Sequence, residues 1–373
     1  MAQKLKTMQL RGAPKAGGAE TIFVRLMVAL SKRKDVVLMP VVRKGGWAAK
    51  RLTEEGVPHQ TAWFGGWWDV FSAFKIKHLA LGFEPDVVMG WMNRGTAFVP
   101  ASPATPKGAS QDAPSFASRQ AWATVARLGG YYKLKNYRGR VEHLIGNTQD
   151  IVDYCVKEGW APEKTAFIGN FTAAPKAGWR GQRGAVRGAY GIAEDAYVML
   201  VAGRIHSVKG IDVALKALAA LPEKAVLLVA GEGPEKAAMQ ALAAELGVEA
   251  RVRWAGWVDD VSRVAAAADV WLVPSRHEPL GNVVLDAWAH GLPVVATRSA
   301  GPVSLIRDGE TGVLVGIDDV SGFVDAVGGL MAKPKRAVAL AAAGEAEYVE
   351  KYGEDVVVER FVEYYKGLKR RKM

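Results

Sequence analysis

The sequence has few of the features that mark secreted, membrane-spanning or disordered proteins. Cys155 is the single cysteine in 373 residues. An internal disulfide or a multi-cysteine metal site is therefore excluded, and a reducing compartment is expected. No run of about 18 uncharged apolar residues occurs, and the first residues lack the apolar stretch of a signal peptide. Because half of the residues are hydrophobic and 23% are charged, we expect a folded, cytoplasmic protein.

The length and the pattern of apolar runs predict two domains of the α/β class. A chain of 373 residues exceeds the usual size of one domain. From 196 to 333, short apolar runs alternate with helical patterns, which is typical of parallel βα units in a doubly wound sheet. The expected buried strands are 197–203, 225–231, 252–256, 270–275, 293–297 and 312–315.

The first half of the chain is less regular but begins in the same way. An apolar run ending near 11 precedes a Gly-rich turn and a helical pattern with Ile22, Leu26, Ala29 and Leu30 on one face. A Gly-, Ala- and Arg-rich stretch, 171–195, is expected to lead into the second domain. We predict a first domain over 1–170, a second over 171–353, and a terminal helix over 354–373 that crosses back to the first.

The excess positive charge lies in the first part of the chain. Residues 1–150 carry 22 Lys and Arg against 10 Asp and Glu, whereas residues 151–373 carry 27 against 28. This asymmetry favours an acidic partner for the first domain, such as a phosphorylated lipid, an anionic bilayer or a polyanionic sugar. The alternative is charge that serves only solubility. No recognised nucleic-acid-binding motif accompanies the basic residues.

The stretch PSRHEPLGNVVLDAWAHGLPVVAT, 274–297, predicts a strand, a loop, a short helix and another strand. We expect Asn282 to cap a helix that begins at Val283, and its free amides to bind phosphate oxygens. Glu278 precedes this helix and Asp286 lies one turn into it, on the face of Asn282. Because carboxylates repel phosphate, their expected partners are hydroxyl groups of a sugar or ribose. The alternative is a surface loop residue at 278 and an exposed helix at 286.

A second cluster of polar residues follows the strand 197–203. Arg204 and Lys209 lie in the loop between this strand and the next helix. Ligands of open α/β sheets bind beyond the carboxyl ends of the strands, so these two cations are candidates to stabilise a diphosphate leaving group. The alternative is that both are solvated surface charges.

Gly17 and Gly18 form a third candidate, between the first expected strand and the first expected helix. Glycines let backbone amides approach a phosphate closely. The full GxGxxG spacing is missing, which disfavours nicotinamide or flavin binding.

The order of these motifs resembles family 4 of the retaining glycosyltransferases. The residues that carry the resemblance are AGGAE (16–20), HLIGNTQDI (143–151), AFIGNF (166–171), AGRIHSVKG (202–210), AGEGP (230–234), AGWVDD (255–260), the stretch 274–297 and IRDGETGVLV (306–315). The match is strongest over 196–316 and diffuse over 30–140. The resemblance implies the GT-B fold, in which two Rossmann-like domains face a central cleft.

The resemblance also implies roles for individual residues. Arg204 and Lys209 would hold the donor diphosphate, and Glu278 would contact sugar hydroxyls. Gly281, Asn282 and Val283 would contact the sugar and phosphates, and Gly17 and Gly18 would close on the donor from the other domain. The family signature has Glu where this chain has Asp286, which would contact the donor ribose. A histidine of the first domain has no clear match, and Gln111 or Asp112 stands in the segment where we would expect it.

The expected reaction is transfer of a sugar from a nucleoside diphosphate donor with retention of anomeric configuration. No D-x-D pair occurs, so we expect no requirement for a divalent metal. We also expect no cofactor, because the nucleoside diphosphate sugar is itself a co-substrate. The stretch 61–83, with Trp63, Trp67, Trp68, Phe71 and Phe74, predicts a helix that suits a membrane interface or packs in the core. We expect a lipid-linked or surface polysaccharide acceptor, such as a lipopolysaccharide core. The alternatives are a nucleotide-sugar epimerase of the same fold and a non-catalytic binding protein.

Overall fold

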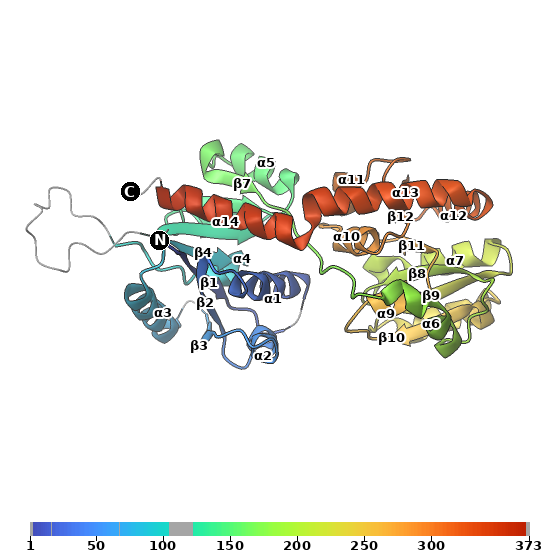
Figure 1. Ribbon diagram of the computed structural model, residues 1–373, viewed down its shortest axis with the longest axis horizontal. Helices are drawn as coiled ribbons and strands as arrows, with labels where there is room; N and C mark the ends of the chain where they lie inside the picture. Colours follow the sequence, from blue (N-terminus) through green and yellow to red (C-terminus); the bar gives the residue numbers. More distant parts are fainter. Residues whose placement is uncertain (1–2, 16, 67, 104–121, 371–373) are drawn as a thin grey trace, which may run out of the picture. The chain divides into compact units, whose positions relative to one another are not determined.

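A computed structural model describes residues 3–15, 17–66, 68–103 and 122–370 of the chain. The chain divides into two compact units, each with its own sheet (Figure 1). Unit 1 comprises residues 1–170 and 354–373, and unit 2 comprises residues 171–353.

The described residues of unit 1 form a parallel sheet of seven strands in the order β3-β2-β1-β4-β5-β6-β7. The strands are β1 (Leu5–Arg11), β2 (Val36–Arg43), β3 (Gln60–Ala62), β4 (Val87–Trp91), β5 (Ala123–Leu128), β6 (His143–Gly146) and β7 (Thr165–Phe167). In the register of the sheet, Leu10 lies between Val41 of β2 and Gly90 of β4. Strands β1 to β3 follow one another toward one edge of the sheet, and strands β4 to β7 follow one another toward the other edge. The topological switch point therefore lies between β1 and β4.

Helices connect the strands of unit 1. They are α1 (Gly18–Ser31), α2 (Trp47–Glu54), α3 (Val70–Phe83), α4 (Met92–Thr96), α5 (Gln149–Lys157) and α14 (Glu354–Arg370). The predicted inner face of α1 is confirmed, because Ile22, Leu26, Ala29 and Leu30 are all buried. The terminal helix α14 runs along the sheet of unit 1 (Figure 1). Ion pairs from Arg33 to Glu359 and from Lys369 to Asp86 hold it there.

Unit 2 contains a second parallel sheet, whose described strands follow the order β10-β9-β8-β11-β12-β13. They are β8 (Tyr197–Ala202), β9 (Ala225–Ala230), β10 (Val252–Gly256), β11 (Val270–Val273), β12 (Val294–Thr297) and β13 (Val313–Val315). Each predicted strand is therefore confirmed to within two residues at either end. The topology switches between β8 and β11.

Helices cover both faces of this sheet because neighbouring residues of a strand point to opposite sides. Leu227 of β9 packs with helices α7 and α12, whereas Leu228 packs with α9 and α10. The helices of unit 2 are α6 (Arg183–Ala189), α7 (Ile211–Ala220), α8 (Lys236–Glu245), α9 (Ser262–Ala265), α10 (Asn282–Ala289), α11 (Ala300–Leu305), α12 (Val320–Ala332) and α13 (Pro334–Glu347). The result is a three-layer sandwich with strands buried on both faces.

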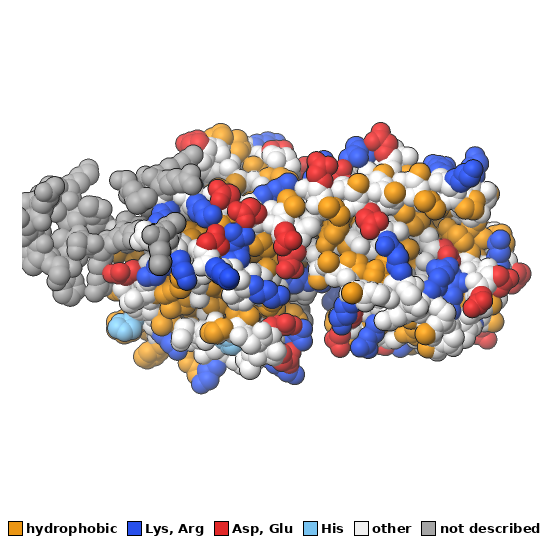
Figure 2. Space-filling model, viewed as in Figure 1, with side chains coloured by type: hydrophobic (Ala, Val, Ile, Leu, Met, Phe, Trp, Pro, Cys, Tyr) orange, Lys and Arg blue, Asp and Glu red, His pale blue; other side chains and the backbone are white. Residues whose placement is uncertain are grey.

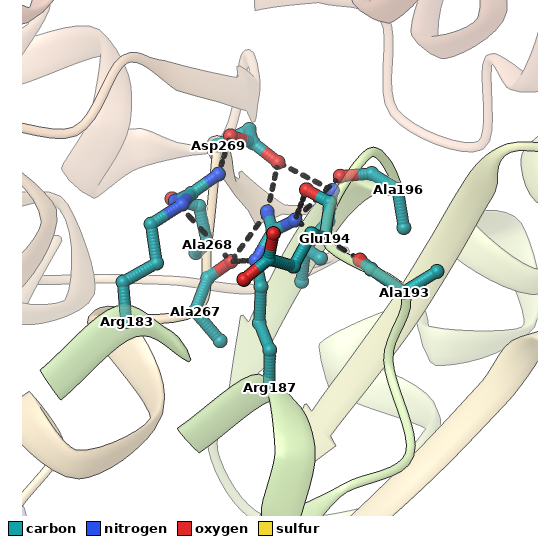
Figure 3. A network of polar contacts seen from close by, with 9 residues as sticks. Arg183, Arg187, Ala193, Glu194, Ala196, Ala267, Ala268 and Asp269 are labelled. Atoms are coloured by element: carbon teal, nitrogen blue, oxygen red, sulfur yellow. Dashed lines mark hydrogen bonds and ion pairs between the residues drawn. The ribbon is translucent and has the colours of Figure 1, made fainter. Parts of the chain in front are cut away.

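A buried arginine anchors α6 at the entry to unit 2. Arg187 is 2% exposed and donates to the carbonyl oxygens of Ala193, Glu194, Ala196 and Ala267 (Figure 3). Its Nη2 also lies 2.8 Å from Asp269 Oδ2, and the same carboxylate pairs with Arg183. A buried guanidinium needs such partners for its donors, so this network fixes the first helix of unit 2 against its sheet.

The helix predicted within 61–83 is shorter than expected. Strand β3 ends at Ala62, and α3 begins only at Val70, with Asp69 as its N-cap accepting from the amide of Ser72. Gly65 and Gly66 separate the two elements. Core packing does not explain the aromatic residues either, because α3 buries only Ser72, Ile76 and Ala80. Trp67 lies outside the described residues.

Candidate active site

The candidate site lies at the carboxyl edge of the sheet in unit 2. The helices that follow β8 and β11 cover opposite faces of the sheet, so a crevice opens between the ends of these strands. A pocket is present there. It is lined by Val201, Ala202, Gly203, Lys209, Ile211, Leu272, Val273, Pro274, Ser275 and Val283.

Two of the predicted residues, Lys209 and Val283, line this pocket, and Lys209 forms an ion pair with a third, Glu278. Lys209 Nζ lies 2.5 Å from Glu278 Oε2. Glu278 is 6% exposed, and it is therefore not the surface residue of the alternative interpretation. A carboxylate buried this deeply is stable only with a charged or hydrogen-bonding partner, and Lys209 supplies it.

Local backbone geometry brings the Lys209 loop against the end of β11. Gly210 has a φ of 64° and forms the N-cap of α7. A β-carbon at this position would lie 1.9 Å from the carbonyl oxygen of Pro274. Only glycine fits both the left-handed backbone and this close approach, so the loop from 204 to 210 is fixed in place at the pocket.

Arg276 joins the two loops that carry Lys209 and Glu278. Its backbone amide donates to Val208 O, and its Nη1 donates to Ser207 O. The guanidinium also binds Asp212 through two hydrogen bonds, at 2.9 and 2.7 Å, and pairs with Asp318. Arg276 and Asp212 stabilise each other's charged form, which raises the pKa of Arg276. Our sequence analysis did not identify this residue. The sequence feature that could have identified Arg276 is its basic side chain within the motif 274–297.

The start of α10 differs from the prediction in one detail. The helix begins at Asn282, and Gly281 occupies the N-cap with a φ of 67°. Asn282 is therefore not the cap. A β-carbon at Gly281 would lie 2.6 Å from Leu305 Cδ1. In the first turn of α11, Gly301 N donates to Glu278 O. The close packing of this turn positions the first amides of α10 beside the pocket lined by Val283.

Asp286 is half-buried one turn into α10. Thr172 Oγ1 donates to its Oδ1. The backbone oxygen of the same residue contacts His290 Nδ1 at 2.6 Å. Asp286 therefore already has a hydroxyl partner within unit 2, consistent with a carboxylate that recognises hydroxyl groups.

Comparison with known proteins identifies the family. The family model described as "Glycosyl transferases group 1" matches residues 196–333. The lipopolysaccharide core biosynthesis glycosyltransferase LpsE of Rhizobium meliloti (strain 1021) is 34% identical over 353 residues, covering 94% of this chain and 96% of that protein. The chain belongs to the glycosyl transferases group 1 family.

Two further proteins are similar along most of their length. The lipopolysaccharide core biosynthesis glycosyltransferase LpsD of the same organism is 29% identical over 358 residues, covering 94% of this chain and 95% of that protein. The crystal structure of Anabaena Alr3699/HepE in complex with UDP superimposes with a TM-score of 0.80 at 19% identity, covering 97% of this chain and 100% of that one. At this identity, the structural likeness concerns the fold.

The protein is therefore a glycosyltransferase with the two Rossmann-like units of the GT-B fold, and the predicted fold class is confirmed. Its full-length relatives are glycosyltransferases. The epimerase and the non-catalytic binding protein are accordingly not favoured. That the two units face a central cleft stays a prediction.

The remaining site residues that the sequence predicts are Arg204, Gly17, Gly18, Gln111 and Asp112. Arg204 is exposed and forms no ion pair with a described residue. Gly17 and Gly18 belong to unit 1, at the N-cap and first position of α1. Their contact with a donor stays a prediction. Gln111 and Asp112 lie outside the described residues.

No group of three or more His, Cys, Asp and Glu side chains in 3–15, 17–66, 68–103 and 122–370 has the arrangement of a metal site. Within the same ranges, no helix is both long and apolar enough to cross a bilayer.

Proposed function

We propose that this glycosyltransferase transfers a sugar, with retention of anomeric configuration, from a nucleoside diphosphate donor to a lipopolysaccharide core or a related surface glycan. The observation that carries the proposal is the Lys209–Glu278 ion pair at the pocket of unit 2. It places a cation suited to phosphate beside a carboxylate suited to sugar hydroxyls, at the edge where open α/β sheets bind ligands.

The donor is held by charge and by backbone amides. Lys209 and Arg204 bind the diphosphate, and the residues from Gly281 to Val283 at the start of α10 donate to phosphate and sugar oxygens. Glu278 accepts from the sugar, and Asp286 accepts from the ribose. Gly17 and Gly18 offer further amides from unit 1. HepE, which shares the fold, was solved with UDP, which supports a donor of this class.

The chemistry relies on positioning and charge stabilisation. The bond from the anomeric carbon to the β-phosphate oxygen breaks, and a bond from the same carbon to the acceptor oxygen forms on the same face. The acceptor proton passes to the departing phosphate oxygen, so no protein base is required. Lys209 and Arg204 stabilise the charge that develops on the leaving group.

The proposed acceptor is supported by the relatives and by the charge of unit 1. LpsE and LpsD are named for lipopolysaccharide core biosynthesis. Residues 1–150 of this chain hold the whole excess of positive charge. A basic surface attracts an acidic glycan over distances comparable to the Debye length, about 8 Å at physiological salt.

Unit 1 also has a surface suited to a bilayer, which we name the aromatic patch. Its members are exposed large apolar side chains around α3: Trp63 (60%), Trp68 (71%), Val70 (65%), Phe71 (80%) and Phe74 (75%). Hydrophobic and basic side chains lie together on this part of unit 1 (Figure 2). Lys44 lies over the Trp63 ring, 4.8 Å from its centre, and Lys75 and Lys77 are exposed on α3. Aromatic rings with lysines suit the interface of an anionic membrane.

Vesicle flotation tests the membrane contact. The full chain is mixed with phosphatidylcholine vesicles, with and without phosphatidylglycerol. We expect binding only to the anionic vesicles, and we expect Phe71→Ser with Phe74→Ser to abolish it. Val338→Ser removes an equally exposed apolar residue of unit 2 (68%) and serves as the control. Equal flotation with neutral vesicles, or no effect of the double substitution, contradicts the contact.

A donor screen followed by product analysis tests the reaction itself. Ligand binding raises the melting temperature by mass action, so the nucleoside diphosphate that gives the largest shift identifies the donor base. The matching sugar nucleotides are then incubated with lipopolysaccharide core oligosaccharide, and the anomeric signals of the product are compared with those of the donor by NMR. Inverted product contradicts retention. Absence of nucleoside diphosphate release with every donor contradicts the transferase reaction on this acceptor.

We also propose that transfer needs no divalent metal, because the chain has no D-x-D pair. Activity of the purified enzyme should be the same within a factor of two in EDTA and in MgCl2 or MnCl2. Loss of activity in EDTA that is restored by one of these metals contradicts this part of the proposal.

A further inference from the structure

The sheet of unit 1 has its own topological switch point, between β1 and β4. The rule that places the donor pocket between β8 and β11 in unit 2 places a second ligand site at the carboxyl ends of β1 and β4. β1 ends at Arg11 and is followed by Gly12, and β4 ends at Trp91 and is followed by Met92. Of the site residues predicted from the sequence, Gly17 and Gly18 also follow β1, but they stand at the start of α1 and not directly at the strand end.

The backbone at the end of β4 is strained. Met92 has a φ of 56°, a conformation that is costly for a residue with a side chain. The short helix α4 that follows packs tightly on β1, because a β-carbon at Gly95 would lie 2.3 Å from Leu10 O. Strain of this kind persists where surrounding packing enforces it, and it concentrates at ligand sites.

Three buried polar atoms near this switch point have no hydrogen-bond partner among the described residues. They are Arg11 Nε, Tyr137 Oη and Asn147 Oδ1. Their residues are 5%, 0% and 6% exposed. Tyr132, whose ring centre lies 6.3 Å from that of Tyr137, donates its hydroxyl to Met92 Sδ at 3.6 Å, a weak interaction. A buried polar atom without a hydrogen-bond partner is destabilising, so these three atoms point to a partner that binds.

The charge available at this position belongs to Arg94. Arg11 is already paired with the buried carboxylate of Glu20, and burial lowers the pKa of Arg11 to about 10. Arg94, by contrast, is exposed and makes no ion pair with any residue in the described ranges. Its stem lies over Gly12, where a β-carbon would approach Arg94 Cγ to 2.7 Å. A planar guanidinium without a carboxylate partner is suited to bind a carboxylate or phosphate through two hydrogen bonds.

We propose that the switch point of unit 1 binds an anionic group of the glycan acceptor, a carboxylate or a phosphate, through Arg94. Tyr132 and Asn147 provide hydrogen bonds to the sugar that carries this group. This inference rests on the proposed function. A β-carbon at Gly12 would also lie 2.7 Å from Phe64 Cδ1, and Phe64 directly follows Trp63 of the aromatic patch. The aromatic patch, which suits a lipid anchor, and the switch point, which would bind the acidic glycan, would therefore lie on one edge of the unit.

Chemically edited acceptors test the site and separate the two anions. Core oligosaccharide from a rough-type lipopolysaccharide is used in four forms: untreated, dephosphorylated with hydrogen fluoride, carboxyl-reduced with carbodiimide and borohydride, and treated with both. The ratio kcat/KM for each form is measured with the wild-type chain, Arg94→Gln and Arg94→Lys. Lys164→Ala is the control, because Lys164 is an exposed cation before β7 at the opposite edge of the same sheet.

With the untreated acceptor, we expect Arg94→Gln to lower kcat/KM by about 10- to 100-fold, the usual effect of losing a charged hydrogen bond. We expect Arg94→Lys to recover part of this loss. Removing the recognised anion from the acceptor should cause a similar loss in the wild type and no further loss in Arg94→Gln. The chemical treatment that produces the loss identifies the anion as phosphate or carboxylate. Lys164→Ala should behave as the wild type.

The inference is overturned if Arg94→Gln changes kcat/KM by less than twofold, or if its loss is the same for the acceptor that lacks both anions, since that pattern indicates a structural role. Failure of the proposed function gives a different result. If no donor supports transfer, binding of the four oligosaccharides is measured by calorimetry. Binding of the untreated form to the wild type and not to Arg94→Gln then retains the site while the reaction is rejected. Equal binding to both rejects the site.

Discussion

Lys209 Nζ and Glu278 Oε2 lie 2.5 Å apart although the residues are separated by 69 positions in the chain. The two residues belong to loops that follow β8 and β11, neighbouring strands at the switch point of unit 2. Without a bound sugar nucleotide, Lys209 and Glu278 neutralise each other's charge. A sugar nucleotide that enters the pocket offers phosphate oxygens to the lysine and hydroxyls to the glutamate, so binding exchanges one set of partners for another.

Lys209→Ala should lower turnover by about 10²–10³, the usual effect of removing one donor that stabilises developing charge. Steady-state kinetics with saturating donor measure the effect. Because the substitution also strands Glu278 in a buried position, Lys209→Ala with Glu278→Gln is needed as a second variant. Lys224→Ala, at an exposed position just before β9, should keep normal turnover. Turnover of Lys209→Ala within twofold of the wild type would show that Lys209 does not stabilise the leaving group.

Arg276→Lys should damage donor binding more than folding. Lysine keeps the charge but cannot reproduce the two parallel bonds to Asp212 together with the contact to Asp318. The loops of Lys209 and Glu278 then lose their common anchor. We expect kcat/KM for the donor to fall by roughly tenfold, with a change in melting temperature of only a few degrees. Arg298→Lys, which alters the exposed pair with Asp308, is the matched control and should leave kcat/KM unchanged. An equal loss in both variants contradicts a specific role of Arg276.

Burial of His290 makes the stability of unit 2 depend on pH. The ring is 2% exposed, contacts Ser262 Oγ and Asp286 O, and burial lowers the pKa of His290 below its usual 6.5. Below about pH 6.5, the unfolded chain binds a proton at this residue that the folded chain does not bind, so the free energy of unfolding falls as the pH decreases. The slope from one group is at most about 1.4 kcal/mol per pH unit.

Urea unfolding between pH 7.5 and 5.5 measures this dependence. The stability difference between the wild type and His290→Gln should shrink toward pH 5.5, because the variant has no titrating side chain at position 290. His59→Gln, which removes a histidine of unit 1, should leave the dependence in place. A difference between the wild type and His290→Gln that is constant across this range would contradict the assignment.

Much of this fold could be predicted from the sequence because parallel strands buried on both faces are nearly continuous apolar runs. The run 252–256 coincides with β10, and the run 270–275 exceeds β11 by two residues. The helix within 61–83 was predicted too long. The apolar content of this stretch suggested continuity, but Gly65, Gly66 and the capping Asp69 confine the helix to α3.

The candidate site could be predicted only in part. Glu278 and Lys209 stand in recognisable loops after predicted strands, so their convergence follows from topology. Arg276 has no periodic pattern, and its partner Asp212 is 64 residues away. Gly281 takes the cap position expected for Asn282, because the close approach of Gly301 and Leu305 leaves no room for a side chain there. Such steric constraints arise from tertiary packing and have no local signal.

Arg187→Ala should destabilise unit 2 by about 3–5 kcal/mol, because it removes one of the two arginines that pair with the half-buried Asp269 and takes a hydrogen-bond donor from the carbonyl oxygens of Glu194, Ala196 and Ala267. Arg183 remains beside Asp269, but its exposed side chain cannot reach the carbonyls of Ala193 to Ala196 that Arg187 binds (Figure 3). Hydrogen–deuterium exchange resolves the effect by region. Protection should fall in β8 and α6 and stay unchanged in unit 1, whereas Arg336→Ala, at an exposed position of α13, should change stability by less than about 0.5 kcal/mol. An equal loss of protection in both units would mean that Arg187 acts on the whole chain, and unchanged protection in α6 would mean that the network does not anchor this helix.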